Sequence, residues 1–270
     1  MVGTKLLLAG CGKMGGALLD GWLNQGIAKE DVYVVEPFGG DAVAERFGVT
    51  VRTTLEEIPS GFSPNVVVFA VKPQVMDEVA PPYAAFNGPG TVFMSIAAGR
   101  TIASFERLLG DAAAIVRVMP NTPAAVGRGI SVACGNEAVT PDQRSACLSL
   151  LEAVGESAWV DDEGLLDPVT AVSGSGPAYV FLLIETLAAA GVKAGLAPEL
   201  AEKLARATVA GSGELARQSD DPASTLRENV TSPGGTTAAA LEVLMGDGGM
   251  RELLERAVEA ATRRSRELAG

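Results

Sequence analysis

The chain has 270 residues, of which 47% are apolar and 20% are charged, so it can bury a substantial core. Its 21 Lys and Arg residues against 33 Asp and Glu leave a net charge of −12, which makes nucleic acid and anionic membrane surfaces poor partners. No uncharged apolar stretch reaches the roughly 18 residues of a membrane span, so we expect no membrane-spanning helix.

Residues 1–163 alternate short apolar runs with segments of helical period. We expect strands over 5–9, 32–36, 65–71, 91–97 and 114–119, and further short strands over 129–133 and 158–161 that flank a helix over 141–154. Continuous apolarity predicts strands buried on both faces, as in a parallel sheet covered by helices. The alternation therefore predicts an α/β, Rossmann-like domain with a doubly wound parallel sheet.

A glycine loop follows the first predicted strand. Gly10, Gly12 and Gly15 spell GxGxxG before a helix, a pattern that brings backbone N–H groups close to a pyrophosphate. Glu36 ends the second predicted strand, where a carboxylate suits the ribose 2′-OH of NAD and repels the 2′-phosphate of NADP. The next basic residue, Arg46, is distant in sequence. We predict a dinucleotide cofactor, NADPH or NADH, with appreciable use of NADH.

The absence of histidine limits the chemistry of this site. It excludes Ser-His-Asp and Cys-His catalysis, His-ligated zinc and imidazole acid-base catalysis, and we expect no metal site. Hydride transfer to an imine suits such a protein, because an imine that enters as a protonated iminium needs positioning more than acid catalysis.

The three cysteines, Cys11, Cys134 and Cys147, have no CxxC spacing and are odd in number. That pattern favours a reduced protein in the cytoplasm. Cys11 is expected to be a small residue of the glycine loop.

From residue 164 to 270 the strand-like runs disappear and helix formers dominate. We expect helices over 177–194, 198–218, 222–228, 236–245 and 250–268, which together form a second, all-helical domain. Residues 179–184 are almost uninterruptedly apolar, a face too broad for one small domain to cover. We therefore expect this domain to form a subunit interface.

Two segments rich in glycine and hydroxyl groups are candidate anion sites. Residues 173–177 place Ser173 and Ser175 before a long helix, although a plain helix cap explains them equally well. Residues 231–237 bracket two glycines with four hydroxyl residues, an arrangement that suits a carboxylate.

At this point the motifs become specific. VMPNTP at 118–123, AVSGSGPAY at 171–179 and VTSPGGTT at 230–237 together resemble the pyrroline-5-carboxylate reductase family. So do the glycine loop, AVKP at 70–73 and SIAAG at 95–99. The resemblance runs through the chain in the family's order, and it implies reduction of the cyclic imine 1-pyrroline-5-carboxylate to proline by NAD(P)H. It also implies a homodimer through the helical domain and a possible ring of dimers.

The resemblance and the local patterns together imply the binding residues. For the substrate they are Val230, Thr231, Ser232, Gly234, Gly235, Thr236 and Thr237. For the cofactor they are Gly10, Cys11, Gly12, Lys13, Met14, Gly15, Glu36, Ala70, Val71, Lys72, Pro73, Ala97, Ala98, Gly99, Asn121, Ser173 and Ser175.

Thr237 is the expected catalytic residue. It would hydrogen-bond the ring nitrogen of the imine and relay or orient its proton. A threonine hydroxyl is too weak an acid to act alone at neutral pH, so iminium formation or a water relay must supply most of the activation. Because cofactor and substrate are anionic, local cations such as Lys13, Lys72 or Arg117 would offset the negative net charge.

Two alternatives remain open from the sequence. One is another small-molecule dehydrogenase that acts on hydroxy acids or keto acids, with Lys193 or Lys203 as its acid. The other is a non-catalytic dinucleotide sensor, which would keep the glycine loop but would not need the hydroxyl-rich turn.

Overall fold

The structure is a computed structural model, and it describes residues 3–269. Two compact units make up the chain: one runs to Gly174 and includes the end of the chain from Ala261, and the other spans residues 175–260. The expected domain boundary at 163 marks the end of the strand-rich sequence. The packing boundary lies later, because Leu166 and Ala171 are fully buried in the first unit.

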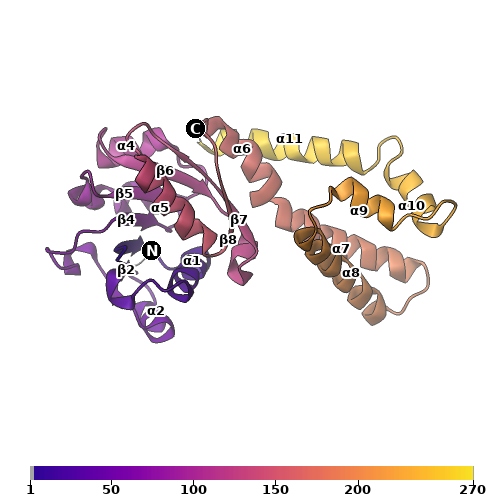
Figure 1. Ribbon diagram of the computed structural model, residues 1–270, viewed down its shortest axis with the longest axis horizontal. Coiled ribbons are helices and arrows are strands. Elements are labelled where there is room, and N and C mark those ends of the chain that lie inside the picture. Colours follow the sequence, from indigo (N-terminus) through magenta and orange to yellow (C-terminus); the bar gives the residue numbers. More distant parts are fainter. Residues whose placement is uncertain (1–2, 270) are drawn as a thin grey trace. The chain divides into compact units, whose positions relative to one another are not determined.

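The first unit is built on an eight-stranded sheet of order β3-β2-β1-β4-β5-β6-β7-β8 (Figure 1). The strands are β1 (Leu6–Ala9), β2 (Val32–Val35), β3 (Thr50–Arg52), β4 (Val66–Phe69), β5 (Val92–Ser95), β6 (Ala114–Met119), β7 (Gly129–Gly135) and β8 (Gly155–Trp159). The chain order reverses between β1 and β4, so the glycine loop leaves the sheet at its topological switch point. The α/β, doubly wound prediction is confirmed.

Three details of the sheet differ from the sequence expectation. β3 was not expected, because this three-residue edge strand is only half-buried and has no apolar run. β7 runs antiparallel to β6, since the short connection between them leaves no room for a crossover helix. β8 covers residues 155–159 rather than 158–161, and it pairs parallel to β7 through the crossover helix α5 (Pro141–Glu152).

Alternate side chains of each central strand contribute to two separate hydrophobic cores, one on each face of the sheet. Leu6 and Leu8 of β1 join the core beneath α1 (Lys13–Asn24), α2 (Gly40–Phe47) and α5. Leu7 and Ala9 join the opposite core with α3 (Met76–Val79), α4 (Ile102–Leu109) and α6 (Leu166–Val169). Burial of both faces explains why the strands are continuously apolar.

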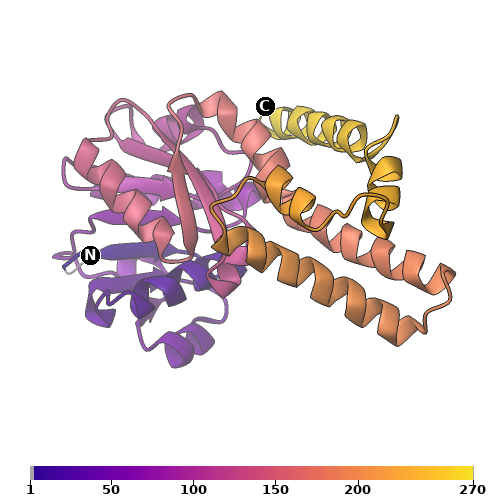
Figure 2. The same ribbon diagram turned by 45° about the vertical axis from the view of Figure 1, so that its right-hand side comes forward.

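The second unit is helical. Its elements are α7 (Gly176–Lys193), α8 (Pro198–Gln218), α9 (Ala223–Asn229), α10 (Thr236–Leu244) and the first part of α11 (Met250–Ala269). These match the five expected helices to within a residue at each end. α7 and α8 run side by side, as Figures 1 and 2 both show.

This helical unit buries very little of its own apolar surface. Within residues 175–260 the buried side chains are those of Ala201 and Ala205. Large apolar side chains such as Phe181, Leu182 and Leu215 remain 59%, 57% and 68% exposed. Exposed apolar area of this kind is typical of surfaces that contact another protein, a ligand or a membrane.

One helical segment of the described chain, Glu163–Lys193, is long and apolar enough by length and composition to cross a membrane. Its most apolar window has a mean hydropathy of 1.4 and none of it is buried. The sequence expectation of no such helix required an uncharged stretch, which Asp167 and Glu185 interrupt. Helices that bury their apolar faces against other protein have the same composition.

Candidate active site

The glycine loop is shaped by close backbone packing. Gly10 has φ of +84°, and a Cβ placed on it would lie 2.7 Å from Cγ1 of Val71. A Cβ on Gly15 would lie 2.8 Å from the carbonyl oxygen of Gly10 and 3.1 Å from Cβ of Ala70. The first and third glycines are therefore required by the fold itself, because any side chain would separate β1, α1 and the loop after β4.

Gly12, by contrast, faces open space. No atom lies within 4 Å of a Cβ placed on Gly12, although the residue is the N-cap of α1. α1 has no side-chain cap and no acidic residue in its first turn, so its first N–H groups are left for an anion. The fit to a dinucleotide pyrophosphate rests on this combination of packed outer glycines, an open middle glycine and an uncapped helix.

Glu36 lies just beyond β2 and turns back onto the glycine loop. Its Oε2 accepts a hydrogen bond of 2.8 Å from the backbone N–H of Cys11, and its Oε1 accepts one of 3.1 Å from the N–H of Phe38. Burial raises the pKa of the Cys11 thiol to about 11, with a further contribution from the Glu36 carboxylate. The two bonds hold a negative charge next to the loop, at the strand end where Rossmann proteins contact the adenosine ribose.

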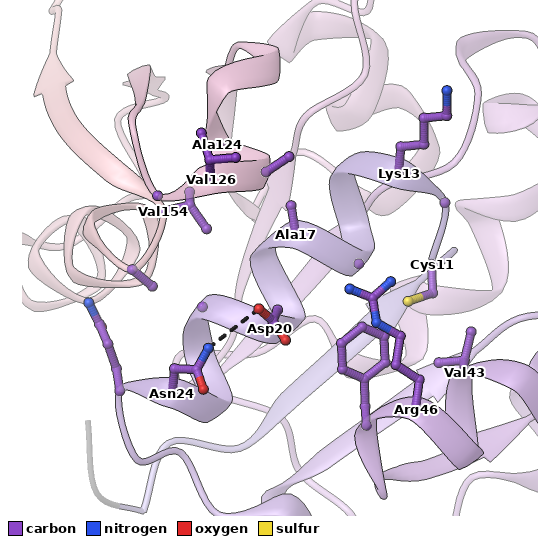
Figure 3. A pocket seen from close by; sticks show the side chains of 18 of the residues that line it. Cys11, Lys13, Ala17, Asp20, Asn24, Val43, Arg46, Ala124, Val126 and Val154 are labelled. Carbon is purple, nitrogen blue, oxygen red and sulfur yellow. Dashed lines mark hydrogen bonds between the residues drawn. The ribbon is translucent and has the colours of Figure 1, made fainter. Parts of the chain in front are cut away.

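A cavity of about 820 Å³ opens beside the same loop, and Figure 3 shows it from close by. Its wall runs from Cys11 and Lys13 along α1 to α2 and to the 3₁₀ turn η5 (Thr122–Val126). The guanidinium of Arg46 stacks on the Phe47 ring at 4.6 Å from its centroid, and its charge acts on Cys11 to oppose the rise in the thiol pKa. The fold thus brings Arg46 close to the glycine loop, and no local sequence pattern predicts this proximity.

The other predicted cofactor segments also follow strands at the carboxyl edge of the sheet. Residues 70–73 follow β4, and the N–H of Ala70 donates to the carbonyl of Ala9 at 2.8 Å. Residues 97–99 follow β5, where the N–H of Ala97 donates to Oγ of Ser95 at 3.2 Å. Asn121 follows β6, and its Oδ1 accepts a bond of 3.0 Å from the N–H of Ile130. Parallel pairing of β1, β4, β5 and β6 brings these segments to one edge.

Arg117 is engaged by another side chain. Its Nη1 lies 2.8 Å from Oε1 of Glu163, and the side chain of Arg117 is 8% exposed. The same carboxylate oxygen accepts the N–H of Ile102 at 2.9 Å. Arg117 is therefore part of a largely buried ion pair between β6 and the 3₁₀ turn η6 (Glu163–Leu165), and Glu163 in turn accepts from α4. Arg117 is thus not an open cation for an anionic ligand.

Residues 173–177 lie mostly in helical turns rather than in the expected loop, with Ser175 as the N-cap residue of α7. Thr170–Gly174 is a π-helical turn, and helical structure continues into α7 with Pro177 in the first turn. The hydroxyl of Ser173 donates to the carbonyl of Val169 at 3.1 Å. A Cβ on Gly174 would meet the terminal methyl group of the Met119 side chain, so Gly174 lies next to β6. Insertions of this kind in a helix occur often at functional sites.

The hydroxyl-rich turn, residues 230–237, connects α9 to α10 and includes Thr236 and Thr237 at the start of α10. The N–H of Gly235 donates to the carbonyl of Ser232 at 3.0 Å, and Gly234 has φ of +70°, as a tight turn with proline in second position requires. The hydroxyl of Thr231 donates to the carbonyl of Arg227 at 2.6 Å. Within residues 3–269 the hydroxyls of Ser232, Thr236 and Thr237 make no hydrogen bond, and α10 begins without a side-chain cap. The turn therefore offers unengaged donors for an anion.

Comparison with known proteins agrees with this architecture. A family model of pyrroline-5-carboxylate reductase dimerisation matches residues 163–268, and a model of coenzyme F420-dependent NADP oxidoreductases matches residues 5–99. The pyrroline-5-carboxylate reductase of Pseudomonas aeruginosa is 39% identical over 268 residues, covering 98% of this chain and 97% of its own.

Solved structures agree over the whole chain as well. A pyrroline-5-carboxylate reductase from Coxiella burnetii matches with a TM-score of 0.93 at 35% identity, and 99% of each chain is covered. The Plasmodium falciparum pyrroline carboxylate reductase, solved with NADP bound, matches with a TM-score of 0.81 at 34% identity, again over 99% of each chain.

The sheet, the glycine loop and these matches define the chain as an NAD(P)-dependent oxidoreductase with a Rossmann-type nucleotide-binding unit. More specifically, the chain belongs to the pyrroline-5-carboxylate reductase family, since its similarity to the Pseudomonas enzyme extends over almost its full length. With that family comes pyrroline-5-carboxylate reductase function, and the match to a dimerisation model implies a homo-oligomer.

Proposed function

We propose that this protein reduces 1-pyrroline-5-carboxylate to proline with NAD(P)H. The observation that carries the proposal is the glycine loop at the switch point of the sheet, open at Gly12 and uncapped at α1. The full-length similarity to pyrroline-5-carboxylate reductases supports the choice of substrate.

The dinucleotide is held in this proposal by the first unit. N–H groups of residues 10–15 bind the pyrophosphate, and residues 70–73 and 97–99 with Asn121 line the rest of the cofactor. Ser173 and Ser175 are also assigned to the cofactor in this proposal. When bound, the reduced nicotinamide supplies a hydride to the imine carbon. The protein's own contribution is to orient the two reactants, for which no histidine is needed.

Glu36 and Arg46 act in opposite directions on the choice of nucleotide. The Glu36 carboxylate is fixed by the N–H groups of Cys11 and Phe38, so it stays available to a ribose hydroxyl and repels a 2′-phosphate. Arg46, exposed on the other side of Cys11, would attract that phosphate. Because the carboxylate is held in place by two hydrogen bonds, while Arg46 is exposed and contacts the Phe47 ring, we propose substantial NADH use. The NADP-bound Plasmodium relative supports NADPH as a second cofactor.

The hydroxyl-rich turn holds the substrate in this proposal. Its free N–H groups and the hydroxyls of Ser232 and Thr236 bind the carboxylate, with Val230, Thr231, Gly234 and Gly235 shaping the pocket. Thr237 hydrogen-bonds the ring nitrogen and orients its proton. The substrate enters as an iminium or is protonated through water, because a threonine hydroxyl is too weak an acid to protonate it alone.

The helical unit forms the homodimer interface in this proposal. Its broadly exposed apolar helices and its near absence of a core support burial against a second subunit, and dimers could assemble further into rings. Such burial would also cover the apolar helix at Glu163–Lys193, so no membrane is needed to shield it. All three cysteines are free thiols, which supports a location in the cytoplasm.

A spectrophotometric assay of nicotinamide oxidation tests the reaction. We expect turnover with pyrroline-5-carboxylate and either nucleotide, and none with 3-hydroxy acids in the reverse direction. Turnover of a hydroxy acid alone would favour the other dehydrogenase class, and tight nucleotide binding without any turnover would favour a sensor.

A further inference from the structure

The carboxyl end of α11 packs directly on the loop after β5. Gly99 has φ of +70°, and a Cβ placed on it would lie 3.0 Å from the carbonyl oxygen of Leu268 and 3.6 Å from its Cβ. Both residues belong to the first unit. Glycine is therefore required twice at this position, by the backbone conformation and by the helix end that faces it.

The end of α11 is held in place by a contact outside that loop. Oγ of Ser265 donates a hydrogen bond of 2.7 Å to Oδ1 of Asp167 in α6, and Ser265 is only 8% exposed. Leu166, the neighbour of Asp167, is fully buried and seats α6 in the core. Hydrogen bonds to a carboxylate are stronger than neutral ones. The end of α11 is thus also held by α6, in addition to its contact with Gly99.

The same loop is tied on its other side to the segment after β4. Arg100 forms a bidentate ion pair with Asp77 of α3, with Nη1 3.0 Å from Oδ2, and the arginine holds the pKa of that carboxyl below its usual range. Nε of Arg100 is buried and has no hydrogen-bond partner in the described chain. The loop is therefore clamped between α3 and the last turn of α11, at the edge where the cofactor segments lie.

We infer that the last turn of α11, residues 265–268, is a positioning segment for dinucleotide binding, because it fixes the loop at residues 97–99. The inference rests on the proposed function, in which that loop lines the cofactor. α11 begins in the helical unit and ends in the nucleotide-binding unit, so one continuous helix runs from the dimerisation region to the cofactor loop.

The test measures dinucleotide affinity without the imine, together with thermal stability and subunit mass. Ser265→Ala, and a chain shortened by residues 267–270, should each raise the Kd for the nucleotide by between about twofold and thirtyfold. The KM for the imine at saturating nucleotide and the subunit mass should not change. Asp167→Asn keeps an acceptor for Ser265 and should have a smaller effect. Arg264→Ala is the matched control, since this exposed side chain pairs only with Glu267.

A double-variant cycle separates positioning from general stability. In the full chain, Gly99→Ala introduces a Cβ against Leu268; in the shortened chain only the positive φ remains unfavourable. We therefore expect Gly99→Ala to raise the Kd for the nucleotide less in the shortened chain than in the full chain. The effects of the substitution and of the shortening on the Kd would then not be additive. Additive effects, or an unchanged Kd with lower thermal stability, would overturn the inference. A wild-type protein that binds neither nucleotide would overturn the proposed function as well.

Discussion

The backbone N–H of Cys11 donates a hydrogen bond of 2.8 Å to Oε2 of Glu36, and this bond joins the glycine loop to the end of β2. It keeps a carboxylate beside the N–H groups that would bind an anionic cofactor. The same side chain therefore stabilises the loop and opposes extra negative charge at the ribose, which makes nucleotide choice a direct test of the geometry.

Neutralising Glu36 should shift the protein towards NADPH. Glu36→Gln keeps the length and one acceptor oxygen but removes the charge, so repulsion of the 2′-phosphate should disappear. We expect the ratio of NADPH to NADH affinity to rise by at least about tenfold, measured as Kd values. Glu45→Gln on the exposed face of α2 is the control. A wild-type preference for NADPH of more than about tenfold would contradict this interpretation of Glu36.

Two alanine substitutions in the glycine loop should have different consequences. Gly12→Ala adds a methyl group into open space, so thermal stability should be close to that of the wild type while nucleotide affinity falls. Gly15→Ala places the methyl group against Gly10 and Ala70, so it should lower stability as well. Unfolding curves and nucleotide titrations distinguish the two. If Gly12→Ala binds the nucleotide with wild-type affinity, the pyrophosphate is not bound by this loop.

Thr237→Ala should slow turnover by about 10²-fold or more, because it removes a hydrogen bond made in the transition state. The fold should be unaffected, since the Thr237 hydroxyl makes no hydrogen bond within the described chain. Thr237→Ser keeps the hydroxyl and should recover most of the rate. The measurement is kcat with saturating nucleotide and imine, and an unchanged kcat in Thr237→Ala would exclude the residue from the mechanism.

Glu163→Gln should destabilise the first unit by about 2–3 kcal/mol, because it leaves the buried guanidinium of Arg117 without its counter-ion. Urea unfolding followed by tryptophan fluorescence reports on this unit, since Trp22 and Trp159 both lie in it. Glu156→Gln on the exposed side of β8 is the control. Loss of nucleotide affinity without loss of stability would mean that Arg117 acts on the ligand after all.

The Cys11 thiol should be unreactive at neutral pH. Its pKa is raised from 9.0 to about 11, mainly by burial and then by Glu36, so little thiolate is present to react. Native alkylation, followed by mass spectrometry, should become fast only near pH 11. Since the unfolded thiol loses its proton first, the thiol should also lower the unfolding free energy as pH rises above 9.0. Glu36→Gln should speed the labelling of Cys11; unchanged labelling would contradict the electrostatic contribution.

Sequence patterns were sufficient for most elements of the fold. Strands buried on both faces are continuously apolar and helices repeat with a longer period, so β1, β4, β5 and the five late helices are found without a structure. Edge strand β3 and the antiparallel direction of β7 were not predicted, because pairing depends on connection length and on neighbours distant in the chain. The π-helical turn at Thr170–Gly174 was missed as well, since a segment rich in serine and glycine looks like a loop in sequence.

By itself the sequence determined what is local: the glycine loop, the acid after the second strand, the hydroxyl-rich turn and the family to which their order belongs. Only the tertiary structure decided which side chains meet across long stretches of chain: Glu36 with Cys11, Arg117 with Glu163, and Leu268 with Gly99. The physical reason is that a backbone conformation is encoded within a few residues. A contact between segments depends instead on how sheet and helices pack, which no single segment specifies.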